Sequence, residues 1–459
     1  MSIALPRPHA RRPAPVPTAP GALPLFGHSL ALLRDPLALL RSLTAHGDVV
    51  RLRLGAGAFY VVCTPERTRE LLHDPRTFDK GGFFFTRLRE LTGNNVGTCP
   101  YADHATQRRL VQPVFHKHRM PGYARTIVDQ TAVVVDEWRD GAVIDVFPDM
   151  LRIGARCAAF LVFGVALPPK VLERNISDIT TYIQGIFIRM FLPPSLVRLP
   201  LPANRRYERA RRRLRDSVED MIGGRDNACA GGDLMTALLD AEPEVGEGRT
   251  RTELTDQLTL MLIAGTESTA TTVSWALHEL SRDSVLQDRV HAELDAVLGG
   301  ESPAHHHVQH LEFLGRVLTE TLRKYPAAWI LTRRTTSDTT LGDHPIPAGA
   351  TVVYSPYLLH HRRDAFPDPD RFDPDRWLST NPTSRKSLIP FGAGTRKCAG
   401  DTFAMTEATL VLAWILTRYT VHPVPASPVR LIPAGALQPG GLRIRLAARP
   451  ATTTPHPQI

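Results

Sequence analysis

One cysteine, Cys398, constrains the fold of this chain more than any other feature. It lies in residues 391–400, Phe-Gly-Ala-Gly-Thr-Arg-Lys-Cys-Ala-Gly, directly after Arg396 and Lys397 and just before a helix-like run at 401–419. A helix N-terminus and neighbouring cations favour the anionic form of a thiol. The absence of a second cysteine nearby excludes a local disulfide or zinc pair. The stretch therefore predicts a thiolate that could ligate iron, with glycines that leave space for a flat cofactor.

Residues 391–400 resemble the haem-binding signature of the cytochrome P450 superfamily, Phe-x-x-Gly-x-Arg-x-Cys-x-Gly, at every fixed position. The resemblance implies that Cys398 is the thiolate ligand of the iron of haem b (iron protoporphyrin IX) and that Arg396 contacts a haem propionate. It also implies a mainly α (α+β) fold, a large helical domain with small antiparallel β-sheets. The alternative is a buried free cysteine in a tight loop.

The chain of 459 residues has no internal repeat and no interior linker rich in Gly, Ser or Pro, which indicates one large domain. We expect a proline-rich disordered leader at 1–22, a single domain at 23–449 and a disordered tail at 450–459. The first residues lack the apolar core of a signal peptide or membrane anchor. Five scattered cysteines fit a reducing cytoplasm. The net charge of +9 leaves nucleic acid, anionic membrane and acidic protein open as partners.

Hydrophobic periodicity and turn residues predict several elements. Residues 49–54 and 58–63 read as a hairpin, and 65–73 as a helix capped by Thr64. Residues 80–101 read as an apolar loop that covers a pocket or other core. The longest helical pattern spans about 252–282.

A polar cluster interrupts this longest helix. Residues 264–269 read Ala-Gly-Thr-Glu-Ser-Thr within an otherwise apolar run, and polar groups in a core-facing helix need a compensating role. We expect the glycine at 265 to allow a close approach to the backbone. The cluster resembles the superfamily's oxygen-activation motif, which implies that Glu267 and Ser268 organise proton delivery to dioxygen. Since serine replaces the usual threonine there, Thr269 is an alternative for part of this role.

Two further segments resemble superfamily regions that bind the haem propionates. A basic helix at 103–112 carries His104 and Arg108 one turn apart, with histidine where tryptophan is more widespread. Past Pro326, the resemblance implies Arg333, with Arg334 as the alternative. A solvated basic face is the other interpretation of His104.

Glu320 and Arg323 stand three residues apart on a predicted helix at 311–324 and can form a charge-assisted pair. Together with residues 369–372, Pro-Asp-Arg-Phe, they resemble the superfamily's buried Glu-Arg-Arg network. The resemblance assigns Arg371 as its third member and gives the network a structural role.

The segments that the resemblance places around the substrate are apolar. They contain Phe83, Phe84, Phe85, Ile186, Phe187, Ala264, Ala328, Trp329 and Ile330. Residues 199–206 and 329–334 also resemble bacterial sesquiterpene oxygenases. We therefore expect a monooxygenase that oxidises a small apolar substrate, a cyclic sesquiterpene such as pentalenene, in natural-product biosynthesis. A fatty acid or macrolide is the alternative substrate, and a haem-thiolate sensor or peroxide-dependent protein is the alternative class.

About sixty residues follow Cys398, too few for a reductase domain of ordinary size. The expected partners are therefore a separate ferredoxin and ferredoxin reductase, with no nucleic acid and no membrane anchor. Basic residues expected near the thiolate face would receive an acidic ferredoxin: Arg109, Lys117, Arg119, Arg385, Lys386 and Lys397. We expect the histidine cluster at 305–310 to be a surface feature and not a metal site.

Overall fold

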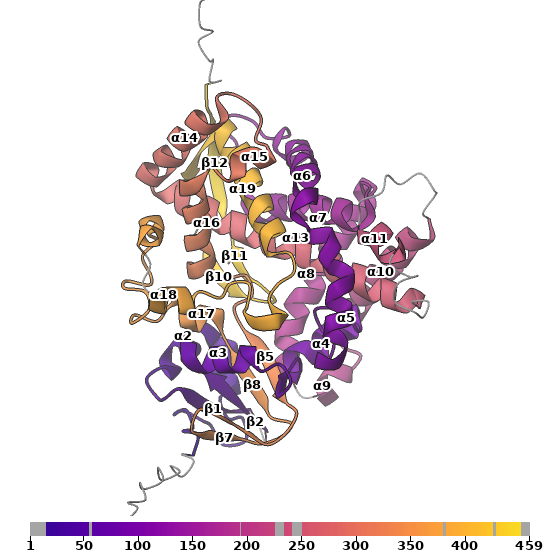
Figure 1. Ribbon diagram of the computed structural model, residues 1–459, viewed down its shortest axis with the longest axis vertical. Coiled ribbons are helices and arrows are strands. Elements are labelled where there is room, and N and C mark those ends of the chain that lie inside the picture. The colour runs from indigo at the N-terminus through magenta and orange to yellow at the C-terminus, as the bar shows by residue number, and fades with distance from the viewer. Residues whose placement is uncertain are drawn as a thin grey trace, which may run out of the picture.

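The computed structural model describes residues 15–54, 57–192, 194–224, 234–240, 250–379, 382–425 and 428–450. Helices form the upper and right-hand parts of the molecule, and the largest β-sheet lies at its lower end (Figure 1). This confirms the predicted helical domain with small sheets. The predicted leader and tail lie largely outside the described residues. Within the leader, however, Ala19 is buried and donates its amide hydrogen to the Arg51 carbonyl, so residues around it pack on the domain.

The structure's helices have the following bounds: α1 Ser29–Arg34, α2 Pro36–Leu43, α3 Pro65–His73, α4 Gly82–Thr92, α5 Tyr101–Val111, η1 Gln112–Phe115, η2 Lys117–Arg119, α6 Met120–Val135, α7 Val146–Phe163, α8 Pro169–Phe191, α9 Pro194–Arg198, α10 Pro202–Gly223, α11 Leu234–Asp240, α13 Arg251–Arg282, α14 Ser284–Leu298, α15 His305–Val308, α16 Glu312–Lys324, α17 Pro356–His360, η3 Pro374–Leu378, α18 Pro382–Ser387, η4 Gly394–Arg396 and α19 Asp401–Arg418.

The strands are β1 Val49–Leu54, β2 Gly57–Val62, β3 Phe78–Asp79, β4 Val143–Asp145, β5 Leu331–Thr335, β6 Thr339–Leu341, β7 His344–Ile346, β8 Thr351–Tyr354, β9 Tyr419–Pro423, β10 Arg430–Pro433, β11 Leu437–Gly440 and β12 Arg443–Ala448. They form a five-stranded sheet in the order β1-β2-β8-β5-β3, a three-stranded sheet β4-β12-β9, and the pairs β10-β11 and β6-β7. All neighbouring strands are antiparallel except β2 and β8, which are parallel.

Helix α13 is the central element of the helical part and packs against α7, α10, α16 and α19. It begins with a capping box, in which Thr250 accepts from the Glu253 amide while the Glu253 carboxylate accepts from the Thr250 amide. Most of its residues are buried on every side, as expected for a helix surrounded by others. The helix therefore holds the polar cluster at 264–269 in the interior of the molecule.

The sequence-based expectation for residues 80–101 was only partly correct. Residues 82–92 form helix α4, which contacts α8, α13 and β5. Its phenylalanines cluster at the start, where Gly82 has φ +76° and a Cβ would lie 2.8 Å from the Thr351 methyl group. The predicted hairpin, the helix at 65–73 with its Thr64 cap and the long helix are confirmed. Among the described helices, none is both long and apolar enough to cross a membrane.

Candidate active site

Cys398 lies between η4 and α19, where its amide hydrogen is donated to the Phe391 carbonyl over 2.9 Å. The residue is exposed, while the other cysteines that the structure describes are buried. Gly394 has φ +69°, and a Cβ there would lie 2.3 Å from the Leu72 carbonyl oxygen of α3. At this position the glycine is required by the neighbouring helix, whereas a Cβ added at Gly392 would meet no atom within 4 Å and the space is open.

The charge argument for a stabilised thiolate is not supported by the structure. Although Cys398 borders open space, the protein packed around it raises the pKa of its thiol by burial, and the Gly400 amide acts in the opposite direction. The two neighbouring cations are engaged elsewhere, because Arg396 donates to Asp79 and Lys397 pairs with Asp401 at 2.5 Å. The thiol therefore favours its protonated form, and a bound metal would have to displace the proton.

Five basic groups from four segments converge at the cysteine loop. They are Lys80, His104 on α5, Arg108 on α5, Arg333 on β5 and Arg396 on η4. Burial lowers the pKa of Lys80 to about 7, and Arg333 and Arg396 contribute to this shift. Burial together with Arg396, Lys80 and Arg108 lowers the pKa of His104 to about 4, so that this ring is neutral at pH 7. In the described part of the chain, the only ion pair of this cluster is Arg396 to Asp79, at 2.8 Å.

These basic groups are short of anionic partners. Arg333 is 4% exposed and, among the residues that the structure describes, donates only to the Thr332 carbonyl and, over 3.4 Å, to the Tyr354 hydroxyl. Arg396 donates to the Cys99 carbonyl and to Asp79, but its Nε is buried without a partner among the described residues. Buried cations are costly unless an anion compensates them. The cluster therefore fits a cofactor that carries carboxylates, and the exposed Cys398 would supply the iron ligand if that cofactor is a haem.

Arg108 links this cluster to the cysteine loop, because its guanidinium donates to the Lys397 carbonyl over 2.6 Å and to Gln112 over 2.7 Å. Of the two alternatives on β5, Arg333 is buried with the basic groups, whereas Arg334 is exposed, so the strand favours Arg333. Lys80 was not predicted from the sequence. Its ammonium group donates to the Gly97 carbonyl over 2.6 Å, and no local motif marks it because the cluster assembles from distant segments.

Some residues of the polar cluster on α13 lie on an accessible face of the helix, and others are buried. Ala264 is exposed in the middle of this long helix, although Ile263 and Thr266 beside it are buried. Ser268, one turn later, is partly exposed and donates its hydroxyl to the Ala264 carbonyl over 2.7 Å. This face of α13 is therefore open. The close approach expected at Gly265 is on the side of α7, where a Cβ would meet Ala158 at 3.1 Å.

Thr269 is buried on a different side and donates to Glu407 of α19 over 2.7 Å. Burial raises the pKa of Glu407 to about 7. Glu267 is also buried, where it accepts from the Gln438 amide, and burial raises its pKa to about 7 as well. Glu407 was missed from the sequence. An acidic residue inside the apolar run of α19 was the available signal.

The Glu320 and Arg323 pair is present, but the predicted third member is wrong. Both side chains are 0% exposed, and Arg323 donates twice to the carboxylate over 2.8 Å. Arg371 contributes only its carbonyl, and its own side chain is exposed. The arginine that reaches Glu320 is Arg376, at 3.4 Å, accompanied by Trp377 at 3.1 Å. The chain repeats Pro-Asp-Arg-aromatic at 369–372 and 374–377, and the second copy faces the carboxylate.

The predicted substrate residues form part of one hydrophobic cluster beside this site. Phe187 of α8 packs on Trp329 with ring centroids 5.4 Å apart, and Phe83 packs edge-on against Phe59 at 5.6 Å. Ile186, Phe187, Trp329 and Ile330 are buried within the cluster, and Phe83 and Phe84 pack against it. Phe85 lies next to the basic groups, 5.5 Å from the Lys80 ammonium and 5.7 Å from the Arg333 guanidinium. Ala264 and Ala328 are the more accessible members.

The histidine cluster on α15 has a helix-capping geometry. Glu301, His306 and His307 have potential ligand atoms within 4.8 Å of one another. However, the Nδ1 of His307 accepts from the Ala304 amide over 3.1 Å, which places the proton of a neutral ring on Nε2. In this tautomer the other ring nitrogen has no lone pair for a metal. His306 and His310 are exposed, as the expected surface role requires, but His307 is buried.

Comparisons with known proteins agree with this geometry. The family described as Cytochrome P450 matches residues 17–444. The chain is 41% identical to pentalenene oxygenase of Streptomyces avermitilis over 94% of this chain and 97% of that protein. It is equally 41% identical to cyclooctat-9-en-7-ol 5-monooxygenase of Streptomyces melanosporofaciens, over 91% of this chain and 92% of the relative. It is 40% identical to cyclooctatin synthase of the same organism, over 93% and 94% of the two chains.

The match covers the cysteine loop, the basic cluster and the open face of α13 together. With a thiol placed for an iron and buried cations placed for carboxylates, this chain belongs to the cytochrome P450 family.

Proposed function

We propose that this protein is a haem b monooxygenase that oxidises a cyclic terpene with electrons from a ferredoxin. The observation that carries the proposal is the basic cluster behind the exposed Cys398, in which Arg333 and the Nε of Arg396 have no anionic partner among the residues described. Two carboxylates of a haem would compensate these charges. When bound, the haem supplies activation of dioxygen and insertion of one oxygen atom into a C–H bond.

The protein's own residues would position the substrate and move protons. Phe187, Trp329 and Ile330 present apolar surface and exclude water, which suits a hydrocarbon that makes no directed hydrogen bonds. Glu267 can hold and release a proton near neutral pH, because burial brings its pKa to about 7. Ser268 offers a hydroxyl on the open face of α13. Thr269 is bound to Glu407, so Ser268 is the better candidate for proton delivery.

The names of the relatives narrow the substrate class, but they do not show whether the substrate of this chain is a hydrocarbon or an alcohol. One relative is named for pentalenene and another for cyclooctat-9-en-7-ol, an alcohol, and the two are equally similar to this chain. The apolar cluster favours a hydrocarbon, since the predicted substrate residues that line it carry no hydrogen-bonding side chain except the Trp329 indole, which donates to Ala434. A cyclic sesquiterpene such as pentalenene is therefore the proposed substrate.

A ferredoxin is the proposed electron donor, with its reductase. Arg109, Lys117, Arg385 and Lys386 are exposed on α5, η2 and α18, and an acidic surface would be steered towards such residues. A strong dependence of the reduction rate on ionic strength, lost when Arg109 and Lys117 are replaced by glutamine, would support this partner. A rate independent of salt would contradict it.

An optical titration of the ferric holoenzyme tests the substrate. We expect pentalenene to give a saturable shift from low-spin to high-spin absorption, and cyclooctat-9-en-7-ol to give a weaker one. A shift with the alcohol alone would identify an oxygenated substrate. A shift only with a fatty acid or macrolide would overturn the terpene assignment.

A further inference from the structure

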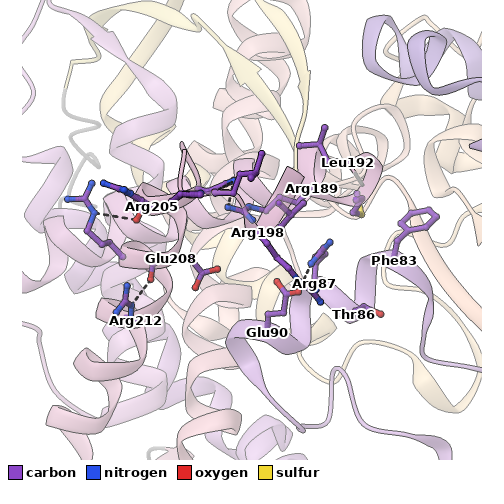
Figure 2. Close-up of a pocket in the computed structure, with 16 residues that line it drawn as sticks. Phe83, Thr86, Arg87, Glu90, Arg189, Leu192, Arg198, Arg205, Glu208 and Arg212 are labelled. Carbon is purple, nitrogen blue, oxygen red and sulfur yellow. Dashed lines mark hydrogen bonds and ion pairs between the residues drawn. The ribbon is translucent and has the colours of Figure 1, made fainter. Parts of the chain in front are cut away.

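A pocket that the cysteine loop does not line lies between α4, α8, α9 and α10 and has a volume of about 1140 Å³. Six arginines line it: Arg87, Arg189, Arg198, Arg205, Arg209 and Arg212. In Figure 2, Arg87, Arg189 and Arg198 lie together near its middle, and Arg205 and Arg212 project from α10. Only two acidic residues line the same pocket, so its walls are strongly cationic.

Both acidic residues have arginine partners. Glu90 pairs with Arg87 at 2.6 Å, and Glu208 pairs with Arg211, which is not among the lining residues, at 2.9 Å. Within the described ranges, no carboxylate lies within ion-pair distance of the four remaining surface arginines of the pocket, which are Arg198, Arg205, Arg209 and Arg212. These guanidinium groups are therefore available to an anion.

Arg189 is the most informative of the six, because it is only 5% exposed and still has only neutral partners among the described residues. It donates to the Asn204 side-chain oxygen over 2.8 Å and lies 3.7 Å above the Tyr207 ring. Asn204 in turn donates to the Leu196 and Leu199 carbonyls. A buried arginine without a carboxylate is costly unless an external anion compensates its charge. Arg189 lines the pocket, so that anion would bind there.

Apolar residues also line the pocket. Phe83, Met190, Leu192, Val197 and Leu199 line it, and Phe83 and Met190 also belong to the hydrophobic cluster that contains Trp329. Leu199 is 45% exposed, and the neighbouring Leu196 and Leu201 are exposed to a similar degree. Apolar surface beside a cluster of arginines matches a molecule with an anionic head and a hydrocarbon tail.

We propose that this pocket binds the diphosphate group of an amphiphile with a hydrocarbon tail, such as a prenyl diphosphate. A single carboxylate would be compensated by one arginine, whereas the set of unpaired guanidinium groups around Arg189 and Arg198 matches a polyanion. Arginine also forms paired hydrogen bonds with phosphate oxygens. The tail would lie along Leu199 and Met190. A membrane phospholipid carries the same chemistry, and the experiment separates the two sources.

Isothermal titration calorimetry of the holoenzyme tests the site. The probes are inorganic diphosphate, hydrolysis-resistant farnesyl thiolodiphosphate and dodecanoate. We expect the double variant Arg198→Ala/Arg205→Ala to weaken diphosphate binding by at least about tenfold, the effect of losing charged hydrogen bonds. Arg206→Ala is the matched control, because Arg206 is exposed on the same helix and does not line the pocket. It should change the affinity by less than about twofold.

The outcomes are decisive in both directions. Tighter binding of farnesyl thiolodiphosphate than of inorganic diphosphate, by about tenfold, would support the apolar wall. Equal binding by the double variant, or dodecanoate bound as tightly as the thiolodiphosphate, would overturn the diphosphate assignment. Sedimentation with phosphatidylglycerol vesicles but no binding of free probes would assign the surface to a membrane instead. Because calorimetry needs no turnover, these results are independent of the spin-state test of the proposed function.

Discussion

Replacing Arg376 by alanine should destabilise the protein, because Arg376, and not the predicted Arg371, is the second arginine that contacts Glu320. The Glu320 carboxylate is fully buried and accepts from Arg323, Arg376 and Trp377. Arg376 also donates to the Pro367 carbonyl over 2.8 Å. A hydrogen bond to a charged group contributes about 1.5 to 3 kcal/mol. The contact of Arg376 with Glu320 is long, at 3.4 Å, so we expect a loss of about 2 kcal/mol.

Two comparisons frame this value. Arg323→Ala removes both 2.8 Å bonds and leaves the Glu320 charge buried without its main partner, so it should cost about 3 to 5 kcal/mol. Arg371→Ala removes an exposed side chain and keeps the carbonyl that Arg323 uses, so it should change stability by less than about 0.5 kcal/mol.

The assay is urea-induced unfolding of the holoprotein, followed by far-UV circular dichroism and by haem absorbance. Agreement of the two signals shows whether a single free energy of unfolding describes the transition. The reasoning is refuted if Arg371→Ala costs as much as Arg376→Ala, or if Arg376→Ala unfolds at the same urea concentration as the unmodified protein.

Four further substitutions test the site. Cys398→Ser should abolish the thiolate-type absorption band of the reduced carbon monoxide complex, and a retained band would remove Cys398 from the ligand position. Ser268→Ala should lower severalfold the fraction of consumed reduced nicotinamide that is used to form product, whereas Thr269→Val should leave this fraction nearly unchanged. Equal losses in the two variants would contradict the separate placement of the two hydroxyls. Burial raises the pKa of Glu267 from 4.5 to about 7, so between pH 4.5 and 7 the folded protein binds a proton that the unfolded chain releases. The free energy of unfolding should therefore fall by up to about 3 kcal/mol as the pH rises through this range. Glu267→Gln should reduce this slope in urea titrations at pH 5 and 7 and leave the part that Glu407 contributes, and an unchanged slope would show that the Glu267 carboxyl does not titrate there.

Much of the local structure followed from the sequence. The capped helix at 65–73, the long helix that carries residues 264–269 and the cysteine loop are encoded by contiguous residues, so periodicity, caps and glycines were sufficient to predict them. Phe187, Trp329 and Ile330, which were predicted as substrate residues, lie in one hydrophobic cluster, and their contact with a substrate remains a prediction.

Charges and close approaches were harder to predict. The close approach expected at Gly265 is present, but its partner, Ala158 of α7, could not be named from the sequence, and the thiol of Cys398 gains little from Arg396, which faces Asp79. Lys80 could be recognised as a member of the basic cluster only in the tertiary structure, where it lies close to Arg333 and Arg396. In each case the partner lies far away in the chain, and no local pattern encodes its direction.

By itself, the sequence determined which residues could ligate iron, carry a proton or form an apolar wall, because side-chain chemistry and helical period are local properties. The tertiary structure decided which of the two repeated Pro-Asp-Arg segments reaches Glu320 and that Thr269 donates its hydroxyl to Glu407. It also buries Arg189 without a carboxylate partner among the described residues. These outcomes depend on burial and on distances between segments, which set the free-energy cost of each charge and arise only when the helices pack.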